Sequence, residues 1–107
     1  MYIGKVLLTN EWEKLEDLIK AQVSGQSAFA FDSDKTYQLQ GEGVEAIRLC
    51  DKSATPADLK DGERIKGTQT AFYKPSDGYL YVRVDLTEKT GIPDFGKVYL
   101  KISEMGV

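Results

Sequence analysis

The most constraining feature of this sequence is a change of hydrophobic period at Gly25. After this residue, apolar and polar side chains alternate in short runs, which turn-forming residues interrupt at intervals of about ten residues. A period of two places successive side chains on opposite faces of a β-strand. Roughly six or seven short strands separated by polar turns are typical of a small antiparallel sandwich or jelly roll. We therefore expect a mainly β fold, with strands from about residue 28 to residue 103.

The clearest strand spans residues 79–84. Its two faces are distinct: one carries Leu80, Val82 and Val84, and the other carries Tyr79, Tyr81 and Arg83. A last strand at residues 97–103 places Val98, Leu100 and Ile102 on one side. The same alternation predicts further short strands at residues 5–8, 36–40, 44–50, 62–66 and 68–73.

A single helix is expected before this alternation, at about residues 10–24. Asn10 and Glu13 are three residues apart, as in the capping box that satisfies free N–H groups at a helix start. The apolar residues that follow recur at spacings of three and four, typical of one helix face: Trp12, Leu15, Leu18, Ile19 and Val23. We expect this face to dock on the sheet, and the alternative is that it mediates assembly between copies.

Composition narrows the possible functions. The chain has 107 residues, a formal net charge of −3, one cysteine and no histidine. A chain of this length buries one core, so we expect a single domain over residues 1–107. Without histidine, the chain lacks the commonest zinc ligand and the usual base of a serine or cysteine nucleophile. Cys50 has no intrachain disulfide partner and is expected to be a small apolar strand residue.

Charge and hydropathy also bear on partners and location. The basic residues are scattered and outnumbered by acidic ones, so the attraction to phosphate that dominates nucleic-acid binding is absent. No stretch approaches the roughly 20 apolar residues that span a bilayer. The start of the chain lacks the apolar segment of a cleaved secretory signal. We therefore expect no nucleic-acid partner, no membrane anchor and no cleaved signal.

Carboxylates are the main remaining candidates for acid–base or metal chemistry. The run that starts at Asp32 begins like a calcium loop, but Tyr37 and Gly43 stand where glycine and glutamate are required. The acidic group at residues 58–63 is typical of a solvated loop. The Asp-Phe-Gly tripeptide at residues 94–96 lacks every other part of a kinase site. We therefore predict a non-enzymatic protein with no catalytic, cofactor-binding or metal-binding residues.

The candidate binding residues are Trp12 and one face of the clearest strand, Tyr79, Tyr81 and Arg83. If these tyrosines lie on the surface, they form a platform on which sugars can stack, which suggests a carbohydrate-binding or adhesion module. The alternative is that they are cross-strand partners, each pair stabilising the sheet by roughly 0.2–1 kcal/mol. A third interpretation is a subunit contact, where tyrosine is enriched.

The order of the predicted elements supplies one further indication. A helix with Trp12 precedes the segments Tyr-Gln-Leu-Gln at 37–40 and Ile-Arg-Leu-Cys at 47–50. A polar loop, a Gly-Glu-Arg-Ile step at 62–65 and the segment Gly-Tyr-Leu-Tyr-Val-Arg at 78–83 follow. This order resembles the short accessory virion proteins of tailed bacteriophages, including head-decoration proteins and fibre-associated β-domains.

The resemblance implies a structural protein on the virion surface, made in the cytoplasm of the bacterial host. Its partners would be phage capsid or tail proteins, and it would form a homo-oligomer, with a trimer favoured. The contact residues would be Trp12, Tyr79, Tyr81 and Arg83. Residues 84–107 lie outside the pattern, and the strand predicted there would be an added edge strand that closes the domain or pairs with a neighbour.

Overall fold

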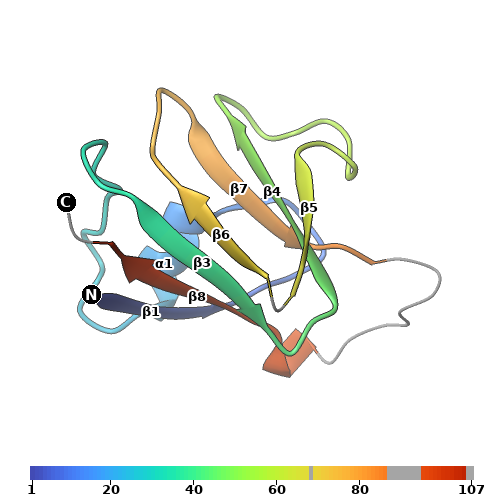
Figure 1. Ribbon diagram of the computed structural model, residues 1–107, viewed down its shortest axis with the longest axis horizontal. Coiled ribbons are helices and arrows are strands. Elements are labelled where there is room, and N and C mark those ends of the chain that lie inside the picture. The colour runs from blue at the N-terminus through green and yellow to red at the C-terminus, as the bar shows by residue number, and fades with distance from the viewer. Residues whose placement is uncertain (68, 87–94, 106–107) are drawn as a thin grey trace.

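The computed structural model describes residues 1–67, 69–86 and 95–105. Within them, eight strands form two four-stranded antiparallel sheets that pack face to face, with one α-helix (Figure 1). The first sheet, sheet A, has the order β1 (Tyr2–Leu7), β8 (Tyr99–Glu104), β3 (Tyr37–Glu42) and β6 (Thr70–Tyr73). Sheet B has the order β2 (Glu13–Lys14), β7 (Tyr79–Val84), β4 (Ala46–Lys52) and β5 (Glu63–Lys66). The mainly β prediction is confirmed.

The strand order is that of a jelly roll. Hydrogen bonding pairs β1 with β8, β2 with β7, β3 with β6 and β4 with β5, all antiparallel. The chain is therefore one long hairpin that winds over itself into two layers. The last strand, β8, lies between β1 and β3. The prediction of an added edge strand near the C-terminus is wrong, because β8 is an interior strand of sheet A.

The core lies between the two sheets and follows the alternation of the sequence. In β7 and β8, the faces predicted to be apolar are buried, as is the Ile47 side chain of β4. The fully buried side chains come from both sheets and the helix, and the largest are Leu8, Leu15, Ile19, Leu39, Ile47, Leu100 and Ile102. Period two therefore identified the inward positions of the long strands correctly.

The helix is shorter than predicted. It spans α1 (Leu15–Gln22), and Lys14 precedes it in an extended conformation without a side-chain cap. The capping box at Asn10 does not form, because Glu13 and Lys14 pair instead with Val82 and Tyr81 of β7 as strand β2. Trp12 consequently lies outside the helix. Docking of the helix is confirmed, since two of its apolar side chains, Leu15 and Ile19, are buried in the core.

The apolar run at residues 29–31, where the strands were expected to begin, is not a strand. Phe31 instead makes edge-to-face contacts with Phe29, Tyr37 and Tyr73, with ring centroids 5.0, 4.8 and 5.2 Å apart. The following Asp32 forms a turn, in which its carboxylate accepts a hydrogen bond of 2.9 Å from the Asp34 N–H. This aromatic cluster closes one end of the sandwich.

The two open sides of the sandwich differ. Helix α1 packs on β1 and β7 and covers one side (Figure 1). The Gln22 side chain accepts a hydrogen bond from the Leu7 N–H at 2.7 Å and donates one to the Leu7 carbonyl at 3.2 Å. Gln22 thus satisfies both backbone groups of Leu7, at the end of β1. On the opposite side, the edge strands are β5 and β6.

Candidate functional site

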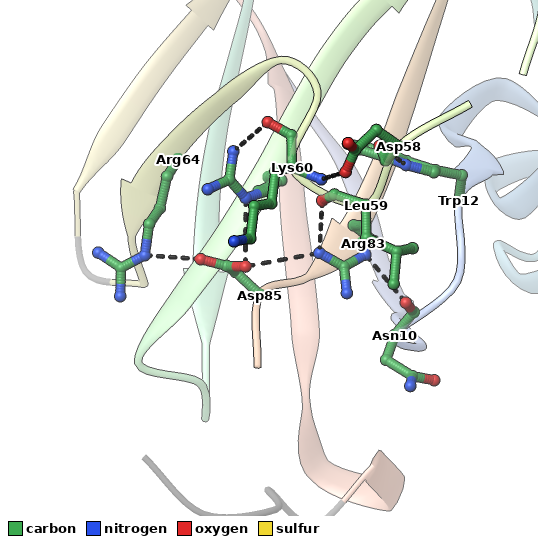
Figure 2. A network of polar contacts seen from close by, with 9 residues as sticks. Asn10, Trp12, Asp58, Leu59, Lys60, Arg64, Arg83 and Asp85 are labelled. Atoms are coloured by element: carbon green, nitrogen blue, oxygen red, sulfur yellow. Dashed lines mark hydrogen bonds and ion pairs between the residues drawn. The ribbon is translucent and has the colours of Figure 1, made fainter. Parts of the chain in front are cut away.

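Three arginines lie side by side across the outer face of sheet B. The strand register aligns Arg64 of β5 with Arg48 of β4, and Arg48 with Arg83 of β7. Like charges directly opposite one another destabilise a sheet. One carboxylate compensates them: Asp85 lies 3.2 Å from Arg48 Nε, 2.6 Å from Arg64 Nε and 3.5 Å from Arg83 Nη1 (Figure 2).

The same arginines fasten a loop to the sheet. Arg48 Nη1 donates to the Lys60 carbonyl at 2.8 Å, and Arg83 Nη1 donates to the Leu59 carbonyl at 2.9 Å. Arg83 Nε donates to the Asn10 carbonyl at 2.9 Å (Figure 2). Burial lowers the pKa of the Arg83 guanidinium, and the nearby Asp85 opposes this effect. The loop at residues 53–61 therefore folds back across the outer face of sheet B.

Trp12 belongs to this network. Its indole N–H donates to the Asp58 carbonyl at 3.0 Å, and the Arg83 guanidinium carbon lies 5.7 Å from the centre of the indole ring. Trp12 and Tyr81 also line one hollow, of about 450 Å³, next to the helix. The structure thus brings together three of the four predicted contact residues, but the polar groups of Trp12 and Arg83 bind this chain's own backbone.

The expectation of an exposed face at Tyr79, Tyr81 and Arg83 is wrong for two of the three. Tyr81 is 3% exposed and Arg83 is 4% exposed. Tyr79 is 44% exposed and lies apart from Trp12, with the Lys14 ammonium 3.8 Å from the centre of its ring. The reason is the loop at residues 53–61, which lies over this face of sheet B. Most of its own residues are exposed, as expected for a solvated loop, but Pro56 is buried.

The acidic residues of the loop stabilise its turn. The Asp61 carboxylate accepts hydrogen bonds from the Asp58 N–H at 3.1 Å and from Lys52 Nζ at 3.2 Å. These two hydrogen bonds lower the pKa of Asp61. Cys50 is buried, and burial raises the pKa of its thiol. In the part of the chain that the structure describes, no three His, Cys, Asp or Glu side chains gather as a metal site.

The outer face of sheet A was not among the predicted sites. One row across its strands consists of Tyr2, Ser103, Gln38 and Phe72, and the next row consists of Lys5, Lys101, Gln40 and Thr70. The two aromatic rings at the ends of the first row are 58% exposed at Tyr2 and 64% exposed at Phe72. Sequence reasoning missed this face because only the strand register brings these distant residues into line.

A groove runs between the two sheets on the side of β5 and β6. Its volume is about 460 Å³, and its lining combines apolar side chains (Leu49, Cys50, Ala71, Phe72, Tyr73 and Leu80) with the charged residues Asp51, Lys52 and Glu63. The two edge strands beside it differ in charge. Strand β5 carries Glu63, Arg64 and Lys66, whereas β6 has the sequence Thr-Ala-Phe-Tyr. Only β5 thus carries the charged side chains that discourage pairing with a further strand.

Comparison with known proteins identified no relative. No family model and no curated protein matches the sequence, and no solved structure matches the chain. Among the described residues, no helix is long and apolar enough to cross a bilayer. The binding chemistry of this chain must therefore be inferred from its own side chains and their positions.

Proposed function

We propose that this chain is a non-enzymatic structural protein of a bacteriophage virion, a capsid decoration or tail- or fibre-associated protein that binds the particle surface. The observation that carries the proposal is the uncharged edge strand β6 beside a groove whose lining is mainly apolar. Such an edge binds a protein segment in extended conformation, through main-chain hydrogen bonds and through alternate side chains that enter the groove.

The other edges of the two sheets are blocked or short. Helix α1 packs on β1 and its Gln22 binds the Leu7 backbone, β2 has only two residues, and β5 carries charges. An edge strand left open presents a row of N–H and C=O groups that template pairing with another chain. Strand β6 fits this role, and Phe72 adds an exposed ring at its centre. The partner segment would belong to a capsid or tail protein.

One further observation supports the proposal, and a second is compatible with it. The order of the elements resembles that of accessory virion proteins, as described for the sequence. Jelly rolls occur in viral capsid domains and also in lectins. Because one fold hosts many functions, this second observation is an analogy. It is equally compatible with a virion component and with a sugar-binding module.

We further propose that the protein acts as a trimer. When three weakly attaching copies are tied together, each later contact becomes intramolecular, and avidity can rise by roughly 10² to 10⁴. Light scattering on the purified chain tests this point. A mass three times that of one chain is the expected result, and a monomer at all accessible concentrations contradicts it.

Purified particles test the virion role. Mass spectrometry should find the chain in them, and density mapping should place it at a symmetry position. The variant Phe72→Lys puts a charge on β6 like those on β5, and we expect its incorporation to fall at least tenfold. Leu59→Lys, at an exposed apolar side chain of the loop at residues 53–61, is the matched control and should incorporate normally. Absence from particles, or equal incorporation of both variants, would overturn the proposal.

A further inference from the structure

We propose that the outer face of sheet A binds an acidic saccharide, specifically a chain of uronic acids, at a hollow centred on Lys101. This site is separate from the β6 edge and its groove. The inference goes beyond the virion role and does not depend on it, because the isolated chain would bind the sugar by itself.

The hollow is built from three neighbouring strands. It has a volume of about 280 Å³ and is lined by Tyr2 of β1, Lys101 and Ser103 of β8, and Gln38 and Gln40 of β3. Sites that enclose a drug-sized ligand measure about 300–1,000 Å³, so this hollow suits a smaller group such as a sugar ring of a longer chain. Since interior strands carry four of the five residues, their positions are fixed by the ladder on both sides.

The lining has the chemistry that a sugar requires. The half-exposed Tyr2 ring provides an apolar surface for the C–H face of a pyranose. A carboxamide offers two N–H donors and one oxygen acceptor, and a serine hydroxyl both donates and accepts. Gln38 and Ser103 thus offer the mixture of donors and acceptors that hydroxyl groups need. A purely apolar partner surface would leave their polar groups without hydrogen bonds to it, at a cost for each.

The charge of the hollow selects an acidic sugar. Lys5, across from Lys101 in the register, is drawn to the Glu42 carboxylate at 3.5 Å. The Glu104 carboxylate on β8 is paired with Lys35 at 2.6 Å. Within the described residues, Lys101 forms no ion pair, so its ammonium is the uncompensated charge at the centre of this face. A uronate carboxylate would supply the missing partner, with charge-assisted hydrogen bonds.

A backbone irregularity places the aromatic ring over this hollow. The ladder between β1 and β8 has a β-bulge between Tyr2 and Gly4. Without it, Tyr2 and Lys5, which are three residues apart, would point to opposite faces of the sheet. The bulge turns both side chains outward, while Val6 points into the core and Gly4 is buried. Bulges often re-aim a side chain in this way beside a binding site.

Calorimetric titration of the purified chain with oligomers of polygalacturonate and alginate tests the inference, with dextran as the neutral probe. We expect saturable binding to a polyuronate and none to dextran. Lys101→Met keeps the apolar stem but removes the charge, and should weaken binding at least tenfold. Tyr2→Ala should weaken it severalfold. The matched controls Lys66→Met and Tyr79→Ala, on sheet B, should bind as the unchanged protein does.

Three outcomes would overturn the inference: no binding to either polyuronate, equal binding to dextran, or equal losses in Lys101→Met and Lys66→Met. The last would mean that any surface lysine attracts the polyanion. Circular dichroism of each variant establishes that it is folded. Because these titrations involve no particle and leave Phe72 unchanged, their failure is distinguishable from failure of the virion role.

Discussion

At the residue scale, Asp85 determines whether sheet B can hold its three arginines. The carboxylate is largely buried and is within 3.5 Å of Arg48, Arg64 and Arg83. Removing one partner of a buried charged group is costly, because the remaining charges lose their compensation. The arginines also hold the loop at residues 53–61, so the loss of Asp85 would affect the loop and the sheet together.

We predict that Asp85→Asn lowers the free energy of unfolding by about 3 kcal/mol, because it leaves three aligned guanidinium groups with no counter-charge. Urea unfolding measures this difference. Asp17→Asn, which removes an exposed carboxylate paired with Lys20, is the control and should change stability by less than about 1 kcal/mol. If the two variants lose the same small amount, the role assigned to Asp85 is wrong.

Tyr73 gives the fold a limit at high pH. Burial raises the pKa of its phenol from 10.0 to about 12. Between these two pH values the folded state keeps the phenol proton that the unfolded state releases. The free energy of unfolding is therefore unaffected by ionisation of Tyr73 below pH 10 and decreases as the pH rises toward 12. We predict that the free energy of unfolding falls across this window and falls less in Tyr73→Phe. Urea titrations at several alkaline pH values measure both slopes, and parallel slopes would contradict the prediction.

At the element scale, the last residue of helix α1 binds the backbone of strand β1. This residue, Gln22, makes two hydrogen bonds with the Leu7 backbone. We predict that Gln22→Ala lowers stability by about 1–2 kcal/mol, since each hydrogen bond contributes about 0.5–1.5 kcal/mol. Hydrogen exchange at the Leu7 amide should accelerate. Lys20→Ala, which removes only exposed ion pairs, should leave that amide protected.

The elements that the sequence predicted correctly are those whose own side chains determine their structure. Alternation in β7 and β8 identified their inward faces, because burial between two sheets selects apolar residues at every second position. The helix start was wrong, since the pairing of Glu13 and Lys14 with β7 outweighs a local capping preference. Register is likewise a property of two strands. The row of arginines and the hollow at Lys101 could therefore not be predicted from the pattern of any single segment.

At the scale of the whole molecule, the nested pairing makes the C-terminal strand indispensable. Strand β8 hydrogen-bonds to β1 on one side and to β3 on the other. We predict that a chain ending before Tyr99 shows no cooperative urea transition, because β1 loses its strand partner and the core loses Leu100 and Ile102. A synthetic peptide of residues 95–105, added in trans, should restore part of the transition. A cooperative transition in the shortened chain alone would refute the prediction.

The interior position of β8 also has a consequence for synthesis in the cell. A ribosome makes β1 long before β8, so sheet A cannot be completed until β8 has been translated. Until then, β1 and β3 each lack the strand that pairs with one of their edges, and they can be bound by chaperones or cut by proteases. Products of premature termination would keep these unpaired edges and be degraded. The strand order thus makes resistance to proteases depend on β8, because only a chain translated through β8 can complete sheet A.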